Sequence, residues 1–105
     1  MNSEPIADVE VNAGALVTRN TQVDVTWRNV DRSPLCETLK VIFCDDHGNR
    51  QSILATGVEN HSGDRGSVRV LMPNYNLPTQ KWKIRVSSEQ KDDTYADSEP
   101  FNLLP

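Results

Sequence analysis

Two cysteines and two histidines are the side chains of this chain best suited to nucleophilic chemistry. Cys44 lies three residues before His47, while Cys36 and His61 are more distant along the chain. A cysteine nucleophile needs a base within hydrogen-bonding distance and a third group that orients this base. Both histidines stand among turn-forming residues, with no sign of a third group. We therefore predict that the chain is not an enzyme and has no catalytic residues.

Acidic side chains concentrate in two expected loops. The first loop carries Asp92, Asp93, Asp97 and Glu99, and the second is bracketed by Asp31 and Glu37. Such oxygen ligands suit Ca²⁺ when they converge, but their spacing matches no known calcium loop. We predict no metal and no cofactor, with weak calcium binding as the alternative.

Four cationic side chains are the candidate binding residues. Lys81, Lys83 and Arg85 alternate with apolar residues, and Lys40 lies in phase on another expected strand. Like charges on one sheet face repel each other unless something offsets them. One interpretation is a solubilising face paired with acids such as Glu37 or Glu99. The other is a docking surface for an acidic protein partner or a glycan.

The two cysteines flank residues 37–43, which we expect to be extended. At about 3.3 Å per residue, an extended run holds the two cysteines roughly 25 Å apart. A disulfide requires Cα atoms within about 7 Å of each other. We predict that Cys36 and Cys44 are free thiols, and a bridge in a secreted domain is the alternative.

Two features of the sequence are candidates for glycosylation or for sugar binding. Asn60, His61 and Ser62 form a glycosylation acceptor triplet in an expected loop. Trp27 and Trp82 are in phase with the expected core and so are predicted to be buried, which leaves Tyr75 and Tyr95 in loops. We expect these two tyrosines at opposite ends of the domain, where they would not form one sugar-binding platform.

Alternating apolar and polar residues predict the elements that position these groups. Val23, Val25 and Trp27 alternate with polar neighbours, as do Trp82, Ile84 and Val86. A period of two places one side of a strand on a core and the other in solvent. We expect seven strands, at residues 6–11, 22–28, 38–44, 51–55, 67–72, 80–87 and 98–103, with a short edge piece at 16–17. Seven short strands separated by turn signals predict an all-β, immunoglobulin-like antiparallel β-sandwich.

The same alternation predicts the core. Its expected members are Val9, Val23, Val25, Trp27, Leu39, Val41, Phe43, Ile53, Val68, Val70, Trp82, Ile84, Val86 and Phe101.

Size and charge limit the classes of partner. The 105 residues suit a single domain, 1–105, and carry a net charge of −4. This balance argues against nucleic acid as a partner. No apolar run approaches the ~20 residues of a membrane span, so we expect no direct membrane insertion. The first residues lack the pattern of a secretory signal, which indicates either a cytoplasmic protein or a domain of a longer precursor.

Several pieces of the chain, taken in order, match a known family. They are residues 23–27, 39–43, 53–60 with Gly63, 68–73, 77–78, 82–88 and 97–101. Over this span the chain resembles the immunoglobulin-like domain of fungal Ser/Thr-rich, GPI-anchored cell-surface proteins, which are related to yeast cell-wall β-1,6-glucan assembly proteins. The resemblance implies a non-enzymatic, extracellular or cell-surface module within a longer chain.

These observations predict a structural or recognition module that makes protein or adhesive contacts. The first alternative is a carbohydrate-binding module for cell-wall glucan. The second is an intracellular protein-interaction domain that uses the basic sheet face.

Overall fold

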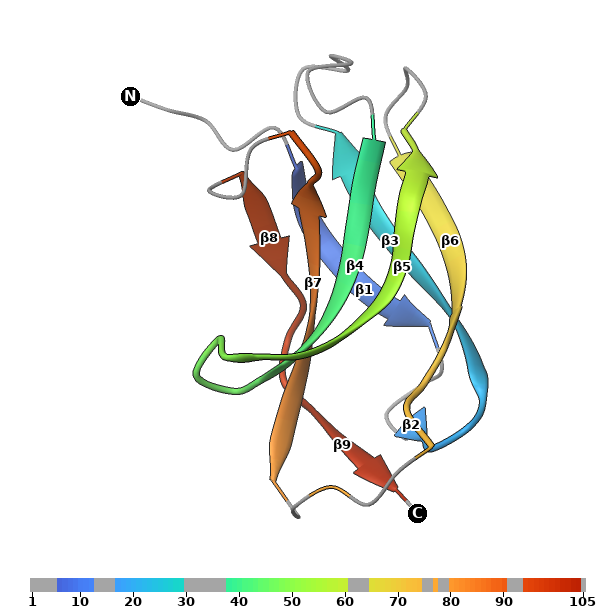
Figure 1. Ribbon diagram of the computed structural model, residues 1–105, viewed down its shortest axis with the longest axis vertical. Helices are drawn as coiled ribbons and strands as arrows, with labels where there is room; N and C mark the ends of the chain where they lie inside the picture. The colour runs from blue at the N-terminus through green and yellow to red at the C-terminus, as the bar shows by residue number, and fades with distance from the viewer. Residues whose placement is uncertain are drawn as a thin grey trace.

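The chain folds as a β-sandwich of two stacked sheets (Figure 1). A computed structural model describes residues 6–12, 17–29, 38–60, 65–74, 77, 80–90 and 94–104. In this part of the chain nine strands and no helix are present. The strands are β1 (Ile6–Asn12), β2 (Val17–Thr18), β3 (Gln22–Asn29), β4 (Thr38–Asp45), β5 (Arg50–Glu59), β6 (Arg65–Leu71), β7 (Lys81–Ser88), β8 (Tyr95–Asp97) and β9 (Phe101–Leu104).

The smaller sheet has the order β1-β3-β6, and the larger has the order β2-β9-β7-β4-β5, with β8 also paired to β7. All pairs are antiparallel except β2 with β9, which are parallel. The described residues contain no helix that is long and apolar enough to cross a membrane.

Strong alternation gives regular pairing in the middle of each sheet. β3 pairs with β6 without interruption from Gln22 opposite Leu71 to Arg28 opposite Arg65. β4 pairs with β7 in the same way from Leu39 opposite Ser88 to Asp45 opposite Trp82. The all-β sandwich is therefore confirmed.

The strand boundaries differ from the prediction at the C-terminal end. The expected strand at 98–103 is shortened to β9, and a further strand, β8, forms at residues 95–97, which we expected to be a loop. β8 and β9 pair with different halves of β7. Pro100 stands between them and has no N–H to donate to a ladder. The Ser98 N–H donates to the Ile84 carbonyl, and the Ser98 hydroxyl accepts from the Ile84 N–H, so Ser98 holds the chain to β7 where the strand breaks.

Most of the expected core is buried, with one error. Ile53 is 57% exposed rather than buried. The pairing of β4 with β5 shifts register at several points, including between the pairs Val41–Ala55 and Ile42–Ile53. Such bulges invert the faces of a strand. Leu54 consequently packs against the core and Ile53 turns outward.

Val68 and Phe101 are partly buried, while Ile6, Val17 and Met72 join the core without having been predicted. Three aromatic rings of the larger sheet pack together in or against the core. Phe43 stacks on Trp82 with ring centroids 4.8 Å apart, and it also contacts Phe101.

Candidate functional site

The outer face of the larger sheet carries the predicted binding residues. Across the pairing of β4 with β7, Lys40 lies opposite Ser87, Ile42 opposite Arg85, and Cys44 opposite Lys83. Opposed residues of a ladder share a face. Lys40, Lys83 and Arg85 therefore lie on one face, as predicted, and Lys81 has the same phase at the start of β7.

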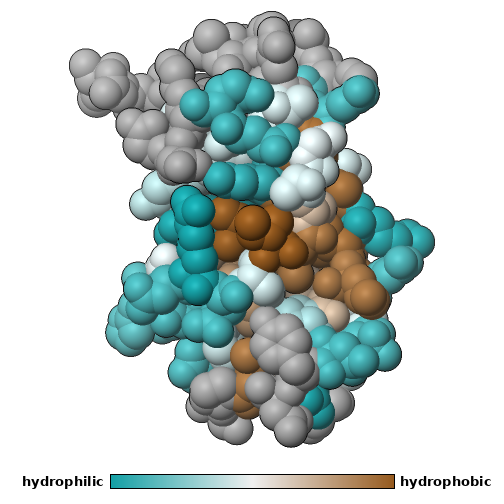
Figure 2. All heavy atoms as spheres, viewed as in Figure 1, coloured by the Kyte–Doolittle hydropathy of each residue, from teal (hydrophilic) through white to brown (hydrophobic). Residues whose placement is uncertain are grey.

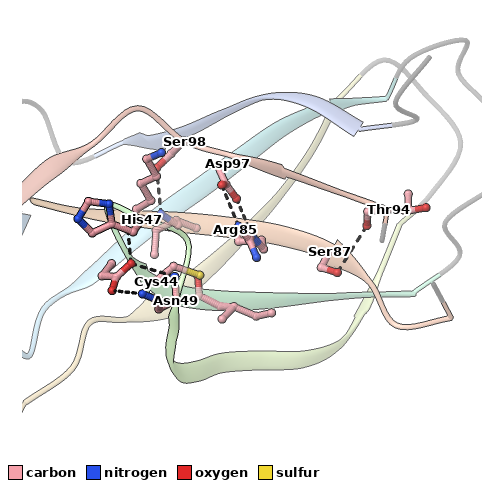
Figure 3. Close-up of polar contacts among 12 residues, drawn as sticks. Cys44, His47, Asn49, Arg85, Ser87, Thr94, Asp97 and Ser98 are labelled. Carbon is pink, nitrogen blue, oxygen red and sulfur yellow. Dashed lines mark hydrogen bonds and ion pairs between the residues drawn. The ribbon is translucent and has the colours of Figure 1, made fainter. Parts of the chain in front are cut away.

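Arg85 is engaged within the domain. Its Nε and Nη2 donate hydrogen bonds of 2.7 and 3.1 Å to the two carboxylate oxygens of Asp97, which faces it from β8 (Figure 3). Its guanidinium carbon lies 3.9 Å from the centroid of the Tyr95 ring. These bonds to Asp97 raise the pKa of Arg85 above its ordinary value. With a side chain only 11% exposed, Arg85 fastens β8 to β7.

The hairpin between β4 and β5 bends across β7 (Figure 1). The Asp45 carboxylate accepts hydrogen bonds from the backbone N–H groups of His47 and Asn49 and from the Asn49 side-chain amide (Figure 3). These bonds stabilise the charged form and lower the pKa of Asp45. Gly48, in the left-handed region at φ +87°, completes the turn.

The turn also contacts the cationic row. A Cβ at Gly48 would lie 3.1 Å from Nη2 of Arg85, so the turn rests against that guanidinium. Asp46 reaches Lys83 with an N–O distance of 3.8 Å. Lys40 makes an interaction as well. The acids that offset Lys83 and Arg85 are thus Asp46 and Asp97, which are among the other acids that the paired-face interpretation allows, and not Glu99; Glu37 lies outside the described residues.

The centre of the same face is apolar. Ile42 and Cys44 are fully buried although they point away from the main core, and Ile53 lies opposite Ile42 on β5. Figure 2 shows hydrophobic side chains gathered in the middle of this face, with hydrophilic ones around them. Arg50 lies opposite Cys44 and is exposed. We call the outer-face patch the set formed by Ile42, Cys44 and Ile53 with Lys40, Arg50 and Lys83 around them.

Cys44 carries a free thiol, as predicted. Burial raises the pKa of this thiol, which disfavours the thiolate that a nucleophile requires. Its Sγ lies 4.0 Å from the Ile42 carbonyl oxygen. Cys44 is therefore a packing residue of the outer-face patch. Cys36 and His61 lie outside the described residues.

Asn60 is 7% exposed and belongs to a buried polar network. Its Oδ1 accepts hydrogen bonds from Trp27 Nε1 at 3.2 Å and from Asn29 Nδ2 at 3.1 Å. Its Nδ2, the atom to which a glycan would be attached, donates to Asn29 Oδ1 at 2.9 Å. Glycosylation of Asn60 stays a prediction, and it would have to precede the closure of this network. His61 and Ser62 lie outside the described residues.

The remaining acidic and aromatic candidates do not form a common site within the described part of the chain. Asp97 is paired with Arg85, whereas Asp31, Asp92 and Asp93 lie outside the described residues. Within the described ranges no three His, Cys, Asp or Glu side chains gather as they would around a metal ion. Tyr95 is 37% exposed, but the Arg85 guanidinium covers one face of its ring. Tyr75 also lies outside the described residues.

No model of a known protein family matches the chain, and no curated protein matches it either.

Proposed function

We propose that this chain is a non-catalytic, immunoglobulin-like recognition module that binds a protein partner through the outer-face patch. The observation that carries the proposal is the position of Ile53. A large aliphatic side chain stands 57% exposed on the edge strand β5, beside its ladder partner Ile42 and near the buried Cys44 on β4. An apolar centre inside a polar rim is the usual anatomy of a protein interface.

The charged residues of the rim indicate the charge of the partner surface. Lys40, Arg50 and Lys83 surround the apolar centre, and together with Asp46, which pairs with Lys83, they carry a net charge of +2, although the whole chain has a net charge of −4. A local basic rim on an acidic protein favours an acidic partner surface and excludes basic ones. Burying one isoleucine side chain contributes about 1.5–3 kcal/mol, so Ile53 supplies affinity while the rim supplies orientation.

The internal contacts keep this face rigid before it binds. Asp97 and Tyr95 hold Arg85, and the Asp45 turn closes over it. A preorganised surface loses less entropy on association than a mobile one. The resemblance given above supports a place for such a module in a longer cell-surface protein. Because Arg85 covers one face of Tyr95, sugar stacking is not the function that we propose.

The test compares two substitutions of exposed aliphatic residues. Ile53→Asp places a charge at the centre of the patch, and Leu71→Asp places one at a 50% exposed leucine on the other sheet. The immobilised wild-type domain and the Leu71→Asp variant should retain the same protein from a cell-surface extract, and salt should weaken its retention. Ile53→Asp should lose that protein. Equal retention by Ile53→Asp, or no retention by the wild type, would contradict the proposal.

A further inference from the structure

A cleft opens at the side of the sandwich, away from the outer-face patch. It has a volume of about 420 Å³ and lies between the edge strand β1, the short strand β2 and residues 98–102. Volumes of about 300–1,000 Å³ are typical of ligand sites. The break between β8 and β9 at Pro100 and the register shift in β1 between Ala7 and Glu10 both border it. The cleft therefore lies where the edges of both sheets are irregular.

The lining combines an apolar floor with charged walls. Val9 and Val17 are core residues, and Phe101 packs against the core from β9. Three exposed charged residues, Glu10, Lys81 and Glu99, line the same cleft. In the part of the chain that the structure describes, no salt bridge joins these three side chains to each other or to another residue, whereas Arg28, Arg69, Lys83 and Arg85 are all paired.

The backbone around the cleft is extended and lies at sheet edges. In the described strands β1 pairs on one side, with β3. β2 pairs with β9 through Leu103 and Leu104 alone among the described residues, which leaves Phe101 and Asn102 paired to β7 on their other side. Extended edges of this kind accept an added strand by main-chain hydrogen bonds, and side-chain pockets then select the sequence.

We infer that this cleft binds an extended peptide segment in which an apolar residue is next to a basic one. The apolar side chain packs on Val9, Val17 and Phe101. The basic side chain meets Glu10 and Glu99, which outnumber the single Lys81 and give this lining a net charge of −1. The site is distinct from the outer-face patch, so it goes beyond the function proposed above.

The test is a titration followed by NMR amide shifts. The probe is the peptide acetyl-Lys-Val-Lys-Val-Lys-amide, and its control is acetyl-Glu-Val-Glu-Val-Glu-amide. The lysine peptide should shift the amide resonances of Val11, Phe101 and Asn102 and should bind more weakly as salt rises. Glu10→Lys and Glu99→Lys should each weaken binding at least about fivefold at low salt.

Two control variants make the outcome decisive. Glu59→Lys changes the charge equally on β5, outside the cleft, and Ile53→Asp disables the outer-face patch; both should keep the wild-type affinity. All four substitutions are at exposed positions, so retained NMR dispersion should verify their fold. Shifts located elsewhere, equal binding of the glutamate peptide, unchanged affinity in Glu10→Lys and Glu99→Lys, or no binding of the lysine peptide would overturn the inference.

Discussion

Trp27 packs its indole ring over Gly66, its direct partner on β6, so closely that a methyl group at Gly66 would overlap the ring. The tryptophan is almost completely buried, and its Nε1 donates to Asn60 at the end of β5. The Trp27 side chain thereby helps to tie the smaller sheet to the larger one, together with the hydrogen bonds between Asn29 and Asn60. Position 66 requires glycine, because the Trp27 ring fills the space that a larger side chain would need.

Gly66→Ala should destabilise the domain by about 1–3 kcal/mol, the usual cost of forcing extra volume into a packed core. Chemical denaturation followed by tryptophan fluorescence measures this loss. Ser67→Ala, at the exposed neighbour, should stay within about 0.5 kcal/mol of the wild type. Equal stability of Gly66→Ala and the wild type would show that the ring does not occupy this space.

The amide pair of Asn29 and Asn60 should show strong coupling. Asn60→Leu removes the acceptor of both Trp27 Nε1 and Asn29 Nδ2, and leaving such groups unsatisfied should cost about 2 kcal/mol. The double variant Asn29→Leu with Asn60→Leu should lose less than the sum of the single losses, because both members of the pair are then apolar. Additive losses in the free energy of unfolding would refute the pairing.

Two ion pairs of the same chemistry should differ in their contribution to stability. Asp97→Asn breaks the partly buried bidentate pair with Arg85 and should cost about 1–2 kcal/mol. Asp24→Asn breaks the exposed pair with Arg69, in which the side chains are 64% and 48% exposed, and should cost less than about 0.5 kcal/mol. The measurement is equilibrium unfolding at low salt, and equal costs would contradict the role given to Arg85.

Asp45 should make the hairpin acid-sensitive. Hydrogen bonds from Asn49 and His47 hold its folded pKa below the ordinary value of 3.8. The stabilisation is thus fully present above pH 3.8 and is lost as the pH falls through the lower, folded pKa. Wild type should be more stable than Asp45→Asn at neutral pH, and the difference should shrink below about pH 4. A difference that does not change with pH would rule out this carboxylate as its source.

Alternation was enough to predict the central strands, because β3, β4 and β7 each have one face on the core. The alternation pattern led to wrong predictions where the pairing register shifts. Residues 51–55 (Gln-Ser-Ile-Leu-Ala) do not alternate, so their own pattern does not show whether Ile53 or Leu54 faces the core. The bulges between β4 and β5 shift the register and turn Ile53 outward. β8 was missed because its short, polar run, Tyr95–Asp97, is stabilised by Arg85 on the neighbouring strand rather than by its own pattern.

The cationic residues of the candidate site could be predicted from the sequence, but the acidic residues that pair with them could not. The phase of Lys40, Lys83 and Arg85 placed them on one face, because phase depends on neighbours along the chain alone. Asp97 and Asp46 come from β8 and from a turn, and their approach depends on how the hairpin folds across β7. The turn sequence around Asp45 was a visible signal of a hairpin, but it does not state the direction in which the hairpin bends.

The orientation of β5 is tested most directly by comparing Ile53→Asp with Leu54→Asp in equilibrium unfolding, together with partner capture. Ile53→Asp should unfold within about 1 kcal/mol of the wild type and lose the captured protein. Leu54→Asp, whose side chain packs against the core, should lose about 3 kcal/mol or more. Comparable losses of stability in the two variants, or full capture by Ile53→Asp, would show that Ile53 is not the exposed centre of a recognition surface.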